Sequence, residues 1–256
     1  MRPDSITIHI DPNSIKIEST YGDRKTVKHT TLESLKAAIS QDYKLETPLL
    51  PGEWGLQKYV RYGSWELFAL SEPPRFTTVK YNLYDNDEEV EDEDFLHFNI
   101  PIPPLLWIFT TRTINNDRQL YYSAVFALKS SILTENDLLY RFPFSNVSGT
   151  VCWGENDIQL SVNPKSIQSL PHIFFSSPFN SDLDGDKFRP FYDDKYINGY
   201  VDDTLSLFRY LHAKSENEKQ EEPEFPLSIL KVDDFDFKDA INHYAETLQR
   251  RRNDEY

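Results

Sequence analysis

Short apolar segments separated by turn residues fill the middle of the chain and constrain its fold more than any other feature. The segments at 56–62 and 65–70 are separated only by Gly63-Ser64, which predicts a tight hairpin turn. Similar segments follow at 76–83, 95–100, 105–111 and 120–128. Segments of this length, joined by short turns, pair with their neighbours along the chain, so we expect an antiparallel meander.

Prolines and asparagines interrupt the apolar segments in the second half of this meander. Pro101, Pro103 and Pro104 lack the N–H group that a strand donates to its neighbour, so we expect an extended segment there that does not pair. Residues 115–117, with the sequence Asn-Asn-Asp, predict a second hairpin turn.

The residues before the meander predict three strands and a helix. Segments 5–10 and 14–18 alternate between apolar and polar residues on either side of an Asp-Pro-Asn turn, as the strands of a hairpin do. Residues 26–29 are a candidate third strand. Thr30 and Glu33 then match the capping box that starts a helix, which we expect to end near residue 42.

The residues after the meander predict short helices and a loop. Pro164 marks the start of a helix whose length Pro171 limits, and the aromatic run 173–179 is expected to pack beneath the loop around residue 152. A second helix is expected at 202–212, followed by a charged loop at 215–224.

The last helix begins after Asp233 or Asp234, either of which can cap it, and its apolar residues recur at helical spacing. They are Phe237, Ile241, Tyr244, Ala245 and Leu248. Helices around an antiparallel meander predict an α+β fold. The expected parts are an N-terminal β-hairpin addition (1–30), a central α+β domain (31–213), a charged linker (214–232) and a C-terminal helix (233–256).

The 256-residue chain carries a formal net charge of −15. This charge repels nucleic-acid phosphates and anionic lipids, so we expect neither nucleic acid nor membrane as a partner. The charge serves solubility, or it forms an acidic surface for a basic protein; much of it lies in segment 85–94, which predicts a mobile loop. No signal peptide is evident, and the apolar run 105–109 is too short to span a bilayer, so we expect a cytoplasmic protein.

Cys152 is the only cysteine, so it forms no disulfide within the chain. It is either an inert packing residue or a nucleophile, and a nucleophilic thiolate needs exposure and some means of stabilising charge. Gly149 allows a tight turn toward the cysteine, Gly154 allows close backbone approach, and the Asn146 side chain can donate to an oxyanion. These residues alone leave both interpretations open.

Other chemistries lack the residues they need. A Cys–His protease requires a placed histidine, and none of the six histidines lies in a recognisable signature; His172 is the nearest downstream. The acidic segment 182–186 departs from the calcium-binding EF-hand pattern in its glycine position and lacks the final glutamate. Zinc-ligand spacing and glycine-rich phosphate loops are absent from the sequence, so we expect no metal and no cofactor.

The stretch 142–180 resembles a bacterial family of ubiquitin-conjugating-enzyme-like proteins, the prokaryotic family D group, which includes protein B of the PRTRC plasmid gene system. The resemblance rests on residues 143–154, which hold Asn146 and Cys152, and on the aromatic motif 174–180. Upstream, the proline-containing segments 47–51 and 103–109 also match. Where relatives are expected to end the aromatic motif with histidine, this chain has Asn180.

The resemblance implies a ubiquitin-conjugating-enzyme-like α+β fold and an acyl-transfer activity. It implies that Cys152 accepts a ubiquitin-like protein as a thioester from an activating-enzyme-like protein and passes it to an acceptor amine. Asn146 is then the residue that steadies the loop and the oxyanion. The alternatives are a non-catalytic binding module of the same fold, with Cys152 buried, and a phage or plasmid structural protein.

Overall fold

The computed structural model describes most of the chain, including all residues from Pro164 to Asn253. The described ranges are 5–11, 14–22, 24–31, 44–50, 52–83, 95–114, 117–132, 134–148, 150–154, 158–160 and 164–253. The helix expected after Thr30 and the acidic segment 85–94 lie outside these ranges.

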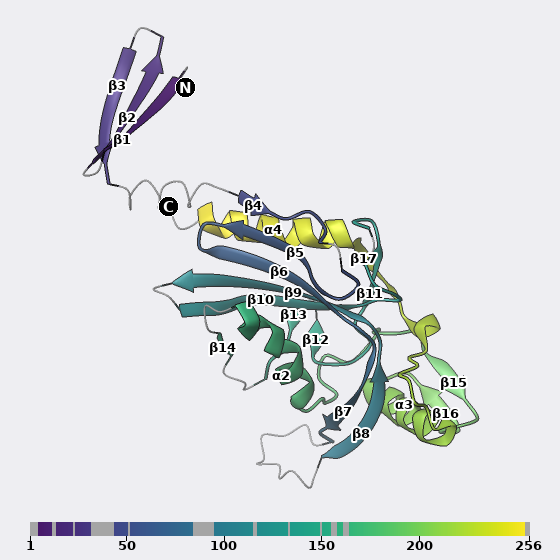
Figure 1. The fold of residues 1–256 in the computed structure, drawn as a ribbon. Coiled ribbons are helices and arrows are strands. Elements are labelled where there is room, and N and C mark those ends of the chain that lie inside the picture. The colour runs from purple at the N-terminus through teal and green to yellow at the C-terminus, as the bar shows by residue number, and fades with distance from the viewer. Residues whose placement is uncertain are drawn as a thin grey trace.

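A large antiparallel sheet forms the centre of the molecule (Figure 1), with the strand order β17-β11-β10-β9-β6-β5-β4 and β14 beside β10. Its strands are β4 (Lys44–Glu46), β5 (Gly55–Tyr62), β6 (Trp65–Glu72), β9 (Leu105–Ile114), β10 (Asp117–Ala127), β11 (Leu138–Arg141), β14 (Gln159–Leu160) and β17 (Val232–Asp236). Both predicted hairpins are confirmed, but the predicted meander is confirmed only in part, because segments 76–83 and 95–100 are not in this sheet. Strand β6 pairs with β9, so the intervening residues leave the sheet.

Those intervening residues form a separate two-stranded pair, β7 (Arg75–Tyr81) and β8 (Leu96–Ile102). Pro101 lies within β8 opposite Phe76, so the prediction that this proline does not pair is wrong. Within the described residues β8 has a neighbour on one side only, and an edge strand tolerates a missing N–H group. Pro103 and Pro104 lie between β8 and β9, and the Pro104 carbonyl accepts a hydrogen bond from the Leu128 N–H group at 2.8 Å, so the expectation of an unpaired segment is wrong at Pro104 as well.

Helices cover both faces of the large sheet. Alternate residues of β9 point to opposite sides: Trp107 and Phe109 pack with one core cluster, and Leu106 and Ile108 with the other. The Trp107 side carries η2 (Pro164–Ser169) and α2 (Leu170–Ser176), and the Leu106 side carries α4 (Phe237–Asn253). Helix α3 (Thr204–Glu218) joins the Trp107 cluster but packs on β8, outside the large sheet. A sheet buried on both faces requires continuous apolar runs, which explains the run at 105–109.

The helix ends differ in part from the predictions. Pro171 lies in the first turn of α2, where its missing N–H group costs nothing, so it starts this helix instead of limiting it. Helix α3 continues six residues beyond the predicted end at 212. Asp236, not Asp233 or Asp234, caps α4 by accepting a hydrogen bond from the Asp239 backbone N–H group.

The apolar face predicted for α4 is confirmed, since all five of its residues are buried against the sheet. In Figure 1, helix α4 runs along the upper side of the sheet, and α2 and α3 lie below it. An α+β architecture is therefore confirmed. No helix among the described residues has the length and apolar character needed to cross a membrane.

The three strands predicted before residue 31 are confirmed as a separate antiparallel sheet, which Figure 1 draws apart from the main body. They are β1 (Ser5–Asp11), β2 (Ser14–Tyr21) and β3 (Arg24–Thr30). Glu18 accepts from the ammonium groups of Lys16 and Lys25, which lower the pKa of its carboxyl to about 2. None of its residues is among the described residues that surround Cys152.

Candidate functional site

Cys152 lies directly after a two-stranded hairpin made of β12 (Val147–Ser148) and β13 (Thr150–Val151). Its backbone N–H group donates to the Asn146 carbonyl across the base of the hairpin, with an N···O distance of 2.8 Å. The side chain of Cys152 is exposed. The interpretation of this cysteine as a buried packing residue is therefore wrong.

Asn146 takes a left-handed backbone conformation with φ of 63°, which asparagine tolerates better than most residues. Its side-chain Nδ2 donates to the Pro178 carbonyl at 3.0 Å and so ties the hairpin to the chain after α2. An amide nitrogen carries two N–H bonds, so this group can bind Pro178 and still serve a ligand. The structure thus brings the two predicted site residues together at one end of the hairpin.

Of the two glycines in this segment, the structure describes only Gly154. Gly149 lies outside the described residues. Gly154 has a φ of +58°, and no atom lies within 4 Å of the position that a Cβ would take. Gly154 is therefore required for its backbone conformation and not for the close approach that we expected.

The back of the hairpin is held by buried polar contacts that the sequence did not reveal. The Ser145 N–H group donates to Thr204 Oγ1 at 2.8 Å, and Thr204 Oγ1 donates to Asp184 Oδ1 at 2.6 Å. Ser145 and Thr204 are both fully buried. This chain of hydrogen bonds connects the residue before Asn146 to the first residue of α3.

A lysine completes the support of the same strand. Lys187 Nζ donates a hydrogen bond to the Val147 carbonyl. Burial lowers the pKa of the Lys187 ammonium group, because the charged form loses hydration when it is partly enclosed. Ser145, Asn146 and Val147 are thus each bound by a residue from a different part of the chain.

Trp153 attaches the other end of the segment to the large sheet and to α2. Its indole Nε1 donates to Ser123 Oγ at 2.9 Å, and Thr150 Oγ1 donates to the Ser123 carbonyl at 3.1 Å. The Trp153 ring lies 6.1 Å from the buried ring of Phe174, measured between centroids. The aromatic run 173–179 therefore packs beneath the cysteine loop, as predicted.

The thiol opens onto a cleft of about 610 Å³. Its described lining residues are Asn82, Phe95, Asn146, Cys152, Trp153, Gly154, Ser176, Ser177, Pro178, Asn180, Asp182 and Leu183. No histidine is among them, and His172 lies on the exposed side of α2. The described part of the cleft therefore offers no histidine to a Cys–His protease.

Asp182 is the one carboxylate among the described residues of this lining. Its Oδ2 accepts from Asn180 Nδ2 at 3.1 Å, and its backbone N–H group donates to Asn180 Oδ1 at 3.0 Å. The sequence alone presents Asp182 only as a candidate calcium ligand. Its position nine residues after the middle of α2 carried no signal of a place beside Cys152.

The other carboxylates of the acidic segment have protein partners. Asp184 binds Thr204, and Asp186 forms ion pairs with Arg141 and Lys231 that lower the pKa of its carboxyl. Among the described residues no group of three or more histidine, cysteine or acidic side chains is placed to hold a metal ion. Asp184 and Asp186 therefore serve structural contacts within the protein.

Comparison with protein families places this geometry in context. A family model described as prokaryotic E2 family D matches residues 63–205, which is more than half of the chain. The chain belongs to prokaryotic E2 family D. The comparisons with curated proteins and with solved structures found no match.

The family match covers β6 to β10, the cysteine hairpin, the cleft and the first residues of α3. It therefore includes Asn146, Cys152, Asp182 and Thr204. The sheet β1–β3 and helix α4 lie outside it. Membership gives the chain a ubiquitin-conjugating-like relationship, and the matched range includes the exposed Cys152.

Proposed function

We propose that the protein carries a ubiquitin-like protein as a thioester on Cys152 and transfers it to an acceptor amine. The observation that supports this function is the exposed thiol of Cys152 in an open cleft. The backbone N–H group of Cys152 is hydrogen-bonded to Asn146, the residue whose side chain supplies an amide donor. A ubiquitin-conjugating-like fold and cytoplasmic partners of the activating-enzyme type belong to the same proposal.

In the first step the Cys152 thiolate attacks the thioester carbonyl that links the ubiquitin-like tail to an activating-enzyme-like protein. A tetrahedral intermediate forms, and its oxyanion accepts a hydrogen bond from the Asn146 amide. The thiolate of the activating protein then leaves and takes a proton from solvent. The product is a new thioester on Cys152 Sγ, and no bond is oxidised or reduced.

In the second step an acceptor amine attacks this thioester. The nitrogen must lose a proton as the amide bond forms, and Asp182, in the same cleft, is the carboxylate that accepts it. Cys152 leaves as a thiolate and is ready for another cycle.

The activity can be tested before any partner is known. A peptide with a C-terminal alkyl thioester is used to load Cys152 by exchange, and mass spectrometry follows its discharge by free lysine. The same peptide on N-acetylcysteine is the reference for an unassisted thioester. We expect the loaded protein to discharge about 100-fold faster than the reference, because a fixed amide donor stabilises the oxyanion.

Equal discharge rates for the protein and N-acetylcysteine would make Cys152 an ordinary surface thiol and refute the proposal. The second experiment supplies ATP with activating-enzyme-like and ubiquitin-like proteins encoded by neighbouring genes. Wild type should form an adduct that a reducing agent removes, Cys152→Ser an adduct that survives the reducing agent, and Cys152→Ala none. An identical adduct on Cys152→Ala would also refute it.

A further inference from the structure

A second two-stranded hairpin presents two tyrosines to solvent. It consists of β15 (Phe191–Asp193) and β16 (Gly199–Val201), and residues 191–201 are called the tyrosine hairpin here. Tyr192 lies directly opposite Tyr200 in the antiparallel register. Their side chains are 60% and 64% exposed, although their rings lie only 6.1 Å apart between centroids.

The opposite face of the tyrosine hairpin is attached to α3. Phe191 and Val201 are also paired in register, and because side chains alternate along a strand they point away from the two tyrosines. The Phe191 ring lies 4.9 Å from that of Tyr210 in α3, and Val201 is fully buried. Packing therefore uses one face of the hairpin and leaves the tyrosine face open.

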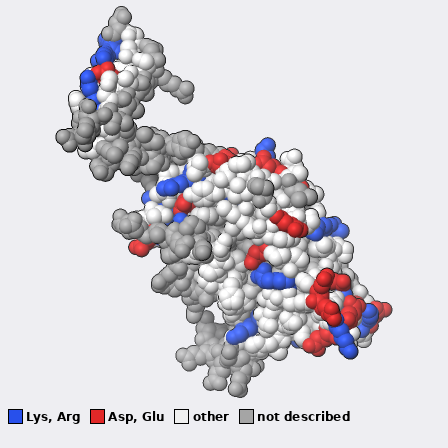
Figure 2. All heavy atoms as spheres, in the orientation of Figure 1, with Lys and Arg blue, Asp and Glu red and all other residues white. Residues whose placement is uncertain are grey.

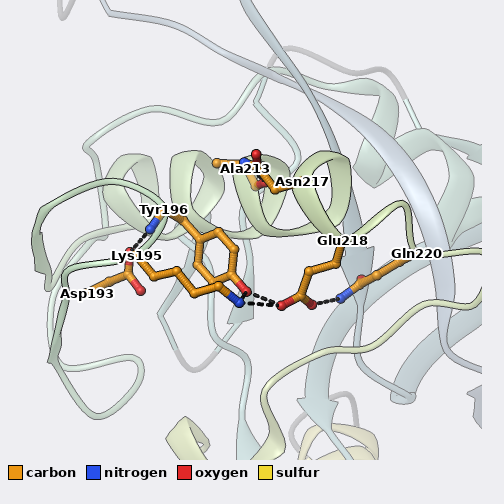
Figure 3. Close-up of polar contacts among 7 residues, drawn as sticks. All are labelled: Asp193, Lys195, Tyr196, Ala213, Asn217, Glu218 and Gln220. Carbon is orange, nitrogen blue, oxygen red and sulfur yellow. Dashed lines mark hydrogen bonds and ion pairs between the residues drawn. The ribbon is translucent and has the colours of Figure 1, made fainter.

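Polar contacts hold the hairpin in one orientation (Figure 3). Lys195 Nζ donates to Glu218 Oε1 at 3.0 Å, and the Tyr196 hydroxyl donates to the same oxygen. At the turn, Asp193 Oδ1 accepts from the backbone N–H groups of Tyr196 and Ile197 at 2.7 and 2.9 Å. A fixed hairpin presents Tyr192 and Tyr200 to a partner with little loss of conformational entropy.

The surroundings of the tyrosines are acidic. Asp194 and Asp202 are exposed and each lies two residues beyond a tyrosine. Between Pro190 and Asp203 the chain has four aspartates and one lysine, and that lysine is paired with Glu218. Figure 2 shows acidic side chains gathered, with basic ones among them, at the end of the molecule that carries α3, β15 and β16 in Figure 1.

We propose that the tyrosine hairpin is a docking surface for an arginine-bearing segment of another protein. A guanidinium group stacks on aromatic faces and pairs with carboxylates, so the tyrosine pair and its flanking aspartates suit one side chain type. Nucleic acid and anionic lipid are repelled by the same aspartates. A second copy is disfavoured, because each copy carries a net charge of −15.

The test uses the whole protein and a capped, fluorescein-labelled peptide of alternating glycine and arginine, measured by fluorescence anisotropy at about 150 mM salt, where the Debye length is near 8 Å. Any acidic surface attracts this peptide, so the informative change removes rings and keeps charge. We expect the Tyr192→Ser/Tyr200→Ser variant to bind about tenfold more weakly than wild type. Tyr192→Phe/Tyr200→Phe keeps the aromatic faces and should bind as wild type does.

Tyr121→Ser is the matched control, because it removes an exposed tyrosine from β10, far along the chain from the hairpin, and it should leave binding unchanged. A lysine peptide of the same length should bind more weakly than the arginine peptide. Equal binding by wild type and the double serine variant would show diffuse attraction and overturn the proposal. Sedimentation that gives a wild-type dimer and a monomeric double serine variant would assign the face to a second copy and also overturn it.

Discussion

Two short hairpins contact helix α3, and they are held in different ways. The cysteine hairpin, β12–β13, is bound at the start of α3 through the fully buried Ser145 and Thr204. The tyrosine hairpin is bound toward the end of α3 through an exposed ion pair at Glu218 and through ring contacts with Tyr210. Buried hydrogen bonds fix atoms in place, whereas exposed pairs contribute little to stability.

This contrast matches what each hairpin is proposed to do. Acyl transfer needs a donor and a thiol within hydrogen-bond reach of one carbonyl, so small displacements of Asn146 relative to Cys152 are costly. Docking of a side chain on two rings tolerates larger displacements. We therefore expect substitutions behind the cysteine hairpin to affect both stability and chemistry, and substitutions behind the tyrosine hairpin to have small effects.

The largest effect should come from Asn146 itself. Asn146→Ala and Asn146→Gly both remove the amide donor, so each should slow lysine-dependent discharge of the loaded protein about 100-fold. Only alanine also strains the left-handed backbone, so it should be less stable than the glycine variant by about 1 kcal/mol. Discharge assays and urea denaturation measure the two effects. If Asn146→Gly discharged the thioester at the wild-type rate, the role of Asn146 would be limited to the conformation of the loop.

The next effect concerns the buried bond behind the hairpin. Thr204→Val keeps the shape of the side chain but leaves the Ser145 N–H group without its acceptor. We expect a loss of about 1–3 kcal/mol in the free energy of unfolding, together with slower discharge. Thr204→Ser retains the hydroxyl and serves as the control. Equal stability of the valine variant and wild type would break the contrast between the two hairpins.

Lys187 should show a smaller effect that depends on pH. Its pKa is lowered in the folded protein, so between that pKa and about 10.5 the unfolded chain binds a proton that the folded chain does not. The stability that Lys187 contributes therefore rises as the pH rises through this range. Relative to Lys187→Met, wild type should gain stability between pH 7 and pH 10 in chemical denaturation. A constant difference would mean that burial does not act on this ammonium group.

The smallest effect is expected behind the tyrosine hairpin. Tyr196 and Lys195 donate to Glu218 and lower the pKa of its carboxyl to about 2, so its contribution is complete above pH 4.5 and is lost as the pH falls toward 2. Glu218→Gln should lower the melting temperature slightly at pH 7, and the difference from wild type should shrink as the pH falls toward 2. Added salt should also reduce the difference in melting temperature between wild type and Glu218→Gln, because it screens exposed ion pairs. A loss as large as that of Thr204→Val would refute the contrast.

Local sequence patterns predicted much of the fold and drew attention to Asn146 and Cys152, which the structure places close together. The strands of the meander and the buried face of α4 follow from spacing within one segment, and Asn146 and Cys152 are only six residues apart. Partners more distant in the sequence were missed. Thr204 binds a residue 59 positions away and Lys187 one 40 positions away, and neither separation leaves a periodic pattern.

The sequence by itself determined that this chain forms an antiparallel α+β structure with a single thiol beside an asparagine. Those features depend on turn residues, alternation and short separations, which act before the chain is folded. Only the tertiary structure decided that Cys152 is exposed, that Asp182 shares its cleft and that α3 supports both hairpins. These contacts depend on how the helices pack on the sheet, and packing joins residues that no local rule relates.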